Sequence, residues 1–277
     1  MLLEISVGCS YGKCTFCRLA DGKTPLQLVS PQVLGDNLAE LASQGESTSR
    51  MFLSGENVLA FKTRYILDVF QYVRAYLPQV SQFAMYGRAD DVARKTDDQL
   101  EALRHAGLDT VYIGVESGNA QVLKSCNKGE TPEEIVAQLH RLDTHGIRYG
   151  LSSILGLGGV ELWREHELDT AALYNHVRPT SIRVMTLTPV EGSPLFQSVE
   201  AGDFQIPSPR ILLEEELLLL EHINYTDHSC RFVGNHVSNA VSLLGNLPKD
   251  KPRLTALLRQ TIDSLDSTFQ PASPATW

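Results

Sequence analysis

The chain of 277 residues carries 24 Lys and Arg against 33 Asp and Glu, which gives a formal net charge of −9. This acidic balance gives little reason to expect nucleic-acid binding. The sequence contains no apolar run of about 18 residues, so we expect no membrane span. The N-terminus lacks the basic start and apolar stretch of a signal peptide. Five cysteines, an odd number, argue against a secreted disulfide framework, so we expect a cytoplasmic protein with reduced thiols.

Short apolar runs alternate with amphipathic stretches along the first two thirds of the chain. The expected strands are residues 2–7, 50–54, 82–87, 109–115, 148–157 and 180–189, and the expected helices are residues 31–44, 63–77, 97–107, 131–146 and 161–177. Ser30 and Thr131 each precede a proline and are the expected N-caps of two of these helices. The alternation predicts an α/β fold with a parallel sheet, either an open doubly wound sheet or a full or partial barrel.

The pattern changes after Pro189. Residues 190–210 are rich in Gly, Pro and Ser and are expected to form a loop, and two helical stretches follow at 212–223 and 251–265 with a polar segment between them. We therefore divide the chain into a core of residues 1–189 and a C-terminal extension of residues 190–277.

Three cysteines lie within nine positions in the segment GCSYGKCTFC, residues 8–17. Cys9, Cys14 and Cys17 have the spacing C-x4-C-x2-C and follow the first expected strand, at the sheet edge where active sites collect in strand–helix folds. Three thiolates can bind three irons of a 4Fe–4S cluster and leave the fourth iron open to an outside ligand. The alternatives are a structural zinc with a distant fourth ligand, or three coincidental buried thiols.

The cysteine segment resembles the cluster loop of the radical S-adenosylmethionine (SAM) superfamily. The commonest form of that loop is C-x3-C-x2-C with an aromatic residue before the last cysteine, a place that Phe16 fills here. The extra residue between Cys9 and Cys14 occurs in some branches and leaves the subfamily open. Four later segments are similar to the superfamily, and three of them to the branch of the elongator catalytic subunit, the methylthiotransferases and the nitrogenase-cofactor enzymes. These segments are FLSGEN (52–57), YIGVESGNAQVLKSCNKGET (112–131), LSSILGLGG (151–159) and LTPVEGSPLF (187–196).

The resemblance implies a partial (β/α)6 TIM-type barrel that binds a 4Fe–4S cluster and SAM. In the superfamily the reduced cluster cleaves SAM to a 5′-deoxyadenosyl radical, which abstracts hydrogen from a substrate. Six strands are too few to close an eight-stranded barrel, so the extension of residues 190–277 is expected to cover the mouth or a lateral gap. The expected partners are an electron donor such as flavodoxin or ferredoxin and an unidentified substrate.

The resemblance also implies SAM contacts near the cysteine loop. Phe16 would lie near the adenine. Gly55 would let the backbone approach the methionine amine, and Glu56 would accept a hydrogen bond from that ammonium group.

Four residues on or after the later strands complete the SAM site that the resemblance implies. Arg88 or Lys128 would hold the SAM carboxylate, with solvated surface charges as the alternative. Glu116 would bind the ribose hydroxyls, because it directly follows an apolar strand. Ser152 would add a polar contact.

Two residues are candidates for the substrate site. Arg183 lies inside an apolar strand, where a buried charge needs a partner, so it is a candidate substrate or SAM contact or part of a structural ion pair. The polar stretch FVGNHVSN, residues 232–239, is expected to be a loop facing the active site, with Asn235 and His236 at the substrate. Cys230 is either a hydrogen donor near the substrate or a buried inert thiol.

The leading hypothesis is a radical SAM enzyme that abstracts hydrogen from an unidentified substrate. A relative of the oxygen-independent coproporphyrinogen dehydrogenases that acts on or carries a tetrapyrrole is a second hypothesis. A non-catalytic cluster-binding protein is a third, and a zinc-stabilised barrel is a fourth. The sequence leaves open whether SAM is consumed, which oligomer forms, and whether a short N-terminal segment of relatives is missing.

Overall fold

The computed structural model describes residues 1–21, 24–45 and 47–265. No helix in these ranges is long and apolar enough to cross a membrane. The chain divides into two compact units. Unit 1 comprises Met1–Gly12, Gly22–Ile113 and Ala137–Tyr149, and unit 2 comprises Lys13–Asp21, Gly114–Val136 and Gly150–Trp277.

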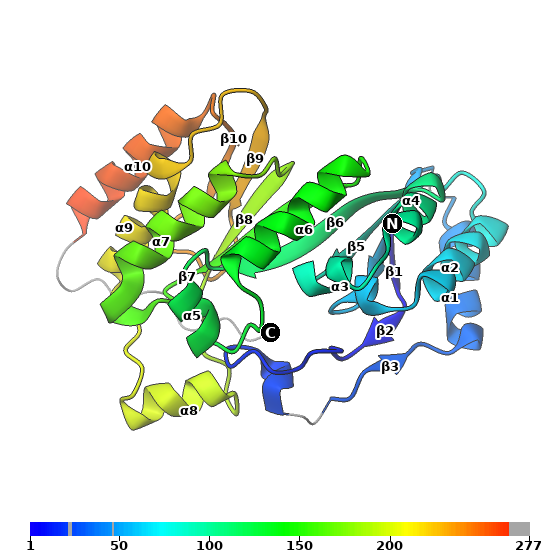
Figure 1. Cartoon of the computed structure of the whole chain (residues 1–277), viewed down its shortest axis with the longest axis horizontal. Helices are drawn as coiled ribbons and strands as arrows, with labels where there is room; N and C mark the ends of the chain where they lie inside the picture. Colours follow the sequence, from blue (N-terminus) through cyan, green and yellow to red (C-terminus); the bar gives the residue numbers. More distant parts are fainter. Residues whose placement is uncertain (22–23, 46, 266–277) are drawn as a thin grey trace. The chain divides into compact units, whose positions relative to one another are not determined.

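Unit 1 contains four parallel strands in the order β1, β4, β5, β6, with helices between them in sequence (Figure 1). The strands are β1 (Leu2–Glu4), β4 (Arg50–Ser54), β5 (Gln82–Gly87) and β6 (Leu108–Glu116), the last three residues of which belong to unit 2. The helices are α1 (Pro31–Ser43), α2 (Thr63–Tyr76), α3 (Ala89–Ala93) and α4 (Asp97–His105), with a 3-10 turn at Val58–Ala60. A short antiparallel pair joins β2 (Ser6–Val7) to β3 (Gln27–Leu28).

The sequence pattern explains these elements. Phe83, Ala84 and Met85 of β5 are all buried, as expected for a parallel strand covered on both faces. The ring of Phe70 from α2 stacks on Phe83 with centroids 3.8 Å apart. The Ser30 hydroxyl accepts a hydrogen bond from the Val33 amide at 3.3 Å and caps α1, as the sequence predicts. Unit 1 therefore has the strand–helix alternation expected of a parallel α/β fold.

Unit 2 contains four strands in the order β7, β8, β9, β10. They are β7 (Arg148–Leu155, in unit 2 from Gly150 onward), β8 (Ser181–Thr186), β9 (Cys230–Gly234) and β10 (Leu243–Leu247). The strands β7, β8 and β9 are parallel, and β10 is antiparallel to β9. The helices are α5 (Ala120–Ser125), α6 (Pro132–Thr144, which continues into unit 1), α7 (Gly159–Asn175), α8 (Pro194–Ala201), α9 (Pro209–His222) and α10 (Lys251–Ser264). Helix α9 packs between α7 and α10 (Figure 1).

Two expectations for the C-terminal extension are wrong. Residues 190–210 are not only a loop, because they contain α8, which begins at Pro194 after the N-cap Ser193. The polar stretch 232–239 is not wholly a loop either, because its first residues belong to β9, and β10 follows. Strand β9 buries Cys230 and Phe232. This alternation fits a strand, but it spans only five residues, and one of them is a glycine, so the sequence pattern is too short to separate from a loop. The extension thus shares a sheet with β8.

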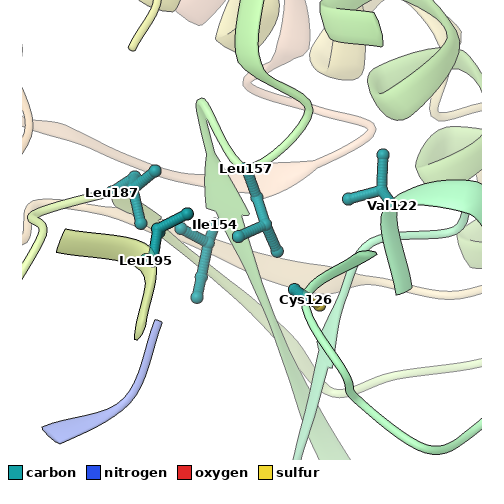
Figure 2. Close-up of a cluster of buried hydrophobic side chains, with 6 residues drawn as sticks. All are labelled: Val122, Cys126, Ile154, Leu157, Leu187 and Leu195. Carbon is teal, nitrogen blue, oxygen red and sulfur yellow. The ribbon is translucent and has the colours of Figure 1, made fainter. Parts of the chain in front are cut away.

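A hydrophobic cluster in unit 2 joins segments that are distant in sequence. Its buried members are Val122, Cys126, Ile154, Leu157, Leu187 and Leu195 (Figure 2). They come from α5 and the residue after it, from β7 and the turn after it, from the residue after β8, and from α8. Phe16 of the cysteine loop packs against this cluster. The last part of the cysteine loop is therefore anchored on the apolar core of unit 2.

Candidate functional site

The cysteine loop begins in unit 1, directly after β2. The thiol of Cys9 is half-buried, and its Sγ accepts a hydrogen bond from the Tyr11 amide at 3.4 Å. In unit 2, Cys14 and Cys17 form the next turn, with the Cys17 amide 3.0 Å from the Cys14 carbonyl oxygen. The Cys17 Sγ accepts from the Leu19 amide at 3.5 Å. Backbone amides thus donate to the sulfur atoms of both Cys9 and Cys17.

The other two cysteines have a different environment. Burial raises the pKa of the Cys126 thiol to about 12, and it raises the pKa of Cys230 to about 12 as well. Both therefore stay protonated at neutral pH and are poor metal ligands. The donor set that fits an iron–sulfur cluster is thus Cys9, Cys14 and Cys17. Among the described residues no three His, Cys, Asp or Glu side chains are already gathered to hold a metal ion, so this set remains a prediction.

Asn57, the last residue of FLSGEN, contacts the cysteine loop within unit 1. Its Oδ1 accepts from the Ser10 amide at 3.2 Å, and its Nδ2 donates to the Ser10 hydroxyl at 2.7 Å. The same Nδ2 is 3.4 Å from Oδ2 of Asp91, which also accepts from the Arg88 amide at 3.0 Å. Burial raises the pKa of Asp91 to about 6. A buried polar network therefore supports the residue after Cys9, and sequence reasoning gave Asn57 and Asp91 no role.

The turn at Gly55 packs closely against β2. A Cβ at Gly55 would overlap the hydroxyl oxygen of Ser6, and it would lie 3.0 Å from Cγ2 of Val58. Only glycine allows this approach. The Ser6 hydroxyl is buried and has no hydrogen-bond partner among the residues described. Glu56 is exposed beside this turn. The geometry is compatible with the SAM contacts expected of Gly55 and Glu56, which remain predictions.

Arg88 lies at the end of β5 and is 5% exposed. Its guanidinium stacks over the ring of Tyr11, 3.9 Å from the centroid, and its Nε donates to Asp90 at 2.9 Å. Arg88 is therefore not a solvated surface charge, because it packs against the cysteine loop. Its expected contact with the SAM carboxylate remains a prediction.

Glu116 and Lys128 meet in unit 2. Nζ of Lys128 lies 3.3 Å from Oε1 of Glu116 and 3.7 Å from Oε2 of Glu130, and all three residues are buried. Glu116 has φ of 66°, a left-handed conformation that is uncommon outside glycine and often marks functional sites. Its carboxylate folds back over Gly114, where a Cβ would overlap Oε1. Two of the predicted SAM contacts are thus brought together.

The segment SCNKG, residues 125–129, also supports the cysteine loop in unit 2. The Asn127 side chain donates to the Lys13 carbonyl oxygen at 3.0 Å, and the Thr15 amide donates to the Cys126 carbonyl oxygen at 2.9 Å. Asn127 has φ of 53°, which asparagine tolerates better than most residues. The residues SCNKG therefore act as a docking segment for the second half of the cysteine loop.

A cavity of about 830 Å³ opens in unit 2 beside the last cysteine. Its walls are Phe16, Cys17, Arg18, Ile154, Met185, Thr186, Leu187, Thr188, Pro189, Val190, Glu191, Phe196 and His236. The lining is mainly apolar with a few polar groups, as is usual for small-molecule sites. The structure thus brings together Phe16, Cys17 and His236, which come from opposite ends of the sequence.

Ser152 and Arg183 lie near this cavity but are not in its wall. They are register partners on β7 and β8, one pleat before Ile154 and Met185, so all four side chains face the same side of the sheet. Arg183 is exposed and Ser152 is half-buried. Partial burial of the ring lowers the pKa of His236, and the positive charge of Arg183 lowers it further.

The model of the Radical SAM superfamily matches residues 3–171 of the chain. A curated relative, 4′-phospho-dehydrooxetanocin synthase of Priestia megaterium, is 26% identical over 173 residues, which are 56% of this chain and 23% of the relative. The chain thus spans about a quarter of the relative's length.

Solved structures share the fold. Coproporphyrinogen III oxidase (HemN) of Escherichia coli matches with a TM-score of 0.58 and 18% identity over 81% of this chain and 52% of its own. The archaeal Methanocaldococcus infernus Elp3 matches with a TM-score of 0.56 and 13% identity over 95% of this chain and 62% of its own. At these identities the likeness shows the fold alone, so HemN does not favour the tetrapyrrole hypothesis.

The fold prediction, an α/β partial TIM-type barrel, is confirmed by these structures. The matched residues of the superfamily model include the three loop cysteines and span more than half of the chain. Enzymes of this family use a 4Fe–4S cluster and SAM. The cysteine loop offers three thiols for the cluster, and the strand ends offer polar groups for SAM. The chain therefore belongs to the radical SAM superfamily.

Proposed function

We propose that this chain is a hydrogen-abstracting radical SAM enzyme acting on a small molecule bound in the unit 2 cavity. The observation that carries the proposal is the shared wall of that cavity. Phe16 and Cys17 of the cysteine loop and His236 of the C-terminal extension line one space of about 830 Å³. A molecule in this space would touch the loop that is expected to hold the cluster.

The residues of the chain would divide the work as follows. Cys9, Cys14 and Cys17 would ligate three irons, while Phe16 would contact the adenine. Bound together, the reduced cluster and SAM would supply a 5′-deoxyadenosyl radical. The apolar walls of the cavity would exclude water, which protects reactive species from side reactions.

The other residues expected at the site would bind the ribose and methionine parts of SAM. Glu116, held by Lys128, would accept the ribose hydroxyls, and Gly55 with Glu56 would receive the methionine amine. Ser152 would add a polar contact, and Lys128 or Arg88 would be near the carboxylate. A small electron-transfer protein such as flavodoxin or ferredoxin would deliver the electron, and the cytoplasm would keep the thiols reduced.

The experiment is anaerobic reconstitution with iron and sulfide, followed by reduction in the presence of SAM. Formation of 5′-deoxyadenosine supports the proposal. Tight SAM binding without any 5′-deoxyadenosine, or a cluster that does not respond to SAM, would instead support a non-catalytic cluster protein. A Phe196→Trp variant narrows the cavity and should leave SAM cleavage intact while lowering turnover of any substrate that is found.

A further inference from the structure

The loop after β6 is held tightly against helix α7 within unit 2. The Gly118 amide donates to Oγ1 of Thr170 at 2.8 Å, and Nδ2 of Asn119 donates to Oδ2 of Asp169 at 2.7 Å. A Cβ at Gly118 would overlap the carbonyl oxygen of Asp169, so only glycine lets the loop approach the helix this closely. The backbone that follows Glu116 is therefore fixed to α7.

The Ser117 side chain makes the most deeply buried of these contacts. Its hydroxyl oxygen lies 2.7 Å from Nδ1 of His166 and accepts from the Asn119 amide at 2.9 Å. Nε2 of His166 lies 3.0 Å from the Ile154 carbonyl oxygen on β7. Ser117 and His166 are both 0% exposed, so these bonds form away from water. One histidine on α7 thus joins the loop after β6 to β7.

The partners of His166 assign its tautomer. A carbonyl oxygen can only accept, so Nε2 of the ring carries a proton and donates to Ile154. Burial lowers the pKa of His166 to about 4, so the ring is neutral near pH 7 and Nδ1 has a free lone pair. The Ser117 hydroxyl therefore donates to Nδ1 while it accepts from the Asn119 amide. These two bonds together fix the orientation of the Ser117 side chain.

Glu116, the residue before Ser117, has a backbone conformation that needs support from its neighbours. Its φ of 66° is unfavourable for a residue with a Cβ, and such a conformation persists only where the surrounding structure enforces it. Glu116 ends β6, so the bond between Ser117 and His166 is the first side-chain contact that fixes the chain after it. In this conformation the Glu116 carboxylate reaches Nζ of Lys128 at 3.3 Å.

We propose that His166 is a positioning residue for SAM, which acts through the Ser117 hydroxyl to hold Glu116 in the conformation that accepts the ribose hydroxyls. The assignment of Glu116 to the ribose rests on the proposed function. His166 is fully buried, so it acts only through Ser117. Without an acceptor at Nδ1, the Glu116 backbone would be free to relax toward a negative φ, and the ribose would lose its carboxylate partner.

The test measures binding to the cluster-loaded, unreduced protein by isothermal titration. The ligands are SAM and a SAM analogue that lacks the 2′ and 3′ hydroxyls. His166→Gln keeps an N–H donor near the place of Nε2 but removes the acceptor at Nδ1. It should weaken SAM by about fivefold to tenfold, the usual effect of losing a hydrogen bond to a charged group, and leave the analogue within about twofold of the wild type. A merely structural role would weaken both ligands alike.

A conservative variant separates the roles of the two ring nitrogens. His166→Asn places its side-chain oxygen near the position of Nδ1, where it accepts from Ser117, so SAM should bind within about twofold of the wild type. Ser117→Ala removes the hydroxyl with little change in packing and should reproduce the loss of His166→Gln, which keeps the test decisive if His166→Gln is unstable. His176→Gln, at the exposed C-terminal end of α7, is the matched control and should bind both ligands normally.

The tautomer of His166 is tested without any ligand. Long-range ¹H–¹⁵N spectra of histidine-labelled protein, assigned by comparison with His166→Gln, should show the proton of His166 on Nε2. A proton on Nδ1 would contradict the proposal, because that nitrogen could then no longer accept from Ser117.

Three binding results overturn the role of His166. His166→Gln binds SAM like the wild type, it weakens the analogue as much as SAM, or His166→Asn loses as much SAM affinity as His166→Gln. Binding to the unreduced cluster needs no turnover. Absence of 5′-deoxyadenosine formation, with the expected differences in ligand binding intact, would therefore reject the proposed function and leave the positioning role of His166 standing.

Discussion

The side-chain amide of Asn57 holds Ser10, the residue after Cys9, through two hydrogen bonds of 3.2 and 2.7 Å. The two residues are 47 positions apart in sequence, and Asn57 is only 3% exposed. The turn after β4 is thus connected to the start of the cysteine loop. A ligand loop that is fixed in this way needs little rearrangement when it binds a cluster.

Replacing Asn57 with Ala should therefore shorten the lifetime of the cluster. Both bonds to Ser10 are lost and the Asp91 carboxylate loses one donor, so we expect the cluster to be removed by a chelator at least several-fold faster. The loss of cluster absorbance with time in EDTA measures this rate. Asn246→Ala on β10 is the matched control and should keep the wild-type rate. Equal rates in all three proteins would show that Asn57 does not position the loop.

The two classes of cysteine should differ in their reactivity toward alkylation. In the cluster-free protein at pH 8, iodoacetamide should modify Cys9, Cys14 and Cys17, which are half-buried, but not Cys126 or Cys230. A thiol whose pKa is about 12 has almost no thiolate at pH 8, and burial also blocks access. Peptide mass spectrometry locates the label. Rapid modification of Cys126 in the folded protein would contradict the buried position of this residue.

Replacing Lys128 should lower the free energy of unfolding, whereas replacing Glu116 should weaken SAM binding. Lys128→Met leaves the buried carboxyl groups of Glu116 and Glu130 without their cation, a change that costs roughly 3 kcal/mol in buried pairs. Urea unfolding measures this loss. Glu116→Gln keeps the shape and leaves Lys128 with Glu130, so it should cost little stability and weaken SAM binding by about tenfold. If both variants unfold like the wild type and bind SAM normally, the pair has neither role.

Three glutamates packed between α7 and α9 predict a pH dependence of stability. Burial raises the pKa of Glu216 to about 8 and that of Glu215 to about 8, and it raises the pKa of Glu167 well above its ordinary value. The neighbouring His166 stays neutral, because burial lowers its pKa to about 4. Native protein then binds more protons than unfolded protein between about pH 4.5 and pH 8. The free energy of unfolding should therefore fall as pH rises through this range.

Glu216→Gln tests this dependence most simply. One Glu216 oxygen is buried without a hydrogen-bond partner among the described residues, so the amide should be tolerated and should remove the cost of ionisation. The difference in free energy of unfolding between pH 5 and pH 8 should shrink by on the order of 1 kcal/mol per unit of pKa shift, as an upper limit. Glu214→Gln, on the same helix with a side chain that is 30% exposed, should leave this difference unchanged. A variant as sensitive to pH as the wild type would contradict the raised pKa of Glu216.

Part of this architecture could be predicted from the sequence. Apolar periodicity and caps such as Ser30 locate the six strands and most helices, because each signal is local. Strand β9 cannot be recognised in the same way, because its alternating pattern covers only five residues, one of them a glycine, and the sequence continues into a polar stretch. The sequence predicts a helix over residues 212–223, but nothing local indicates that Glu215 and Glu216 are buried. Their burial depends on packing of α9 against α7.

The candidate site divides in the same way. The cysteine spacing and the residues at strand ends are local signals, and they led to Phe16, Cys17, Glu116 and Lys128. The hydrogen bonds of Asn57 and Asn127 to the cysteine loop span 47 and 114 positions. Such contacts exist only after folding, and a lone asparagine in a loop carries no periodic signal. Their importance could not be inferred without the structure.

The central claim is that Cys9, Cys14 and Cys17 hold a cluster whose open iron binds SAM. The most direct measurement is electron paramagnetic resonance of the reduced, reconstituted protein with and without SAM, alongside Cys14→Ala and Cys126→Ala. We predict a 4Fe–4S signal that SAM shifts in the wild type and in Cys126→Ala, and no such signal in Cys14→Ala. A signal that persists when all three loop cysteines are replaced, or one that saturating SAM leaves unchanged in the wild type, would contradict the account.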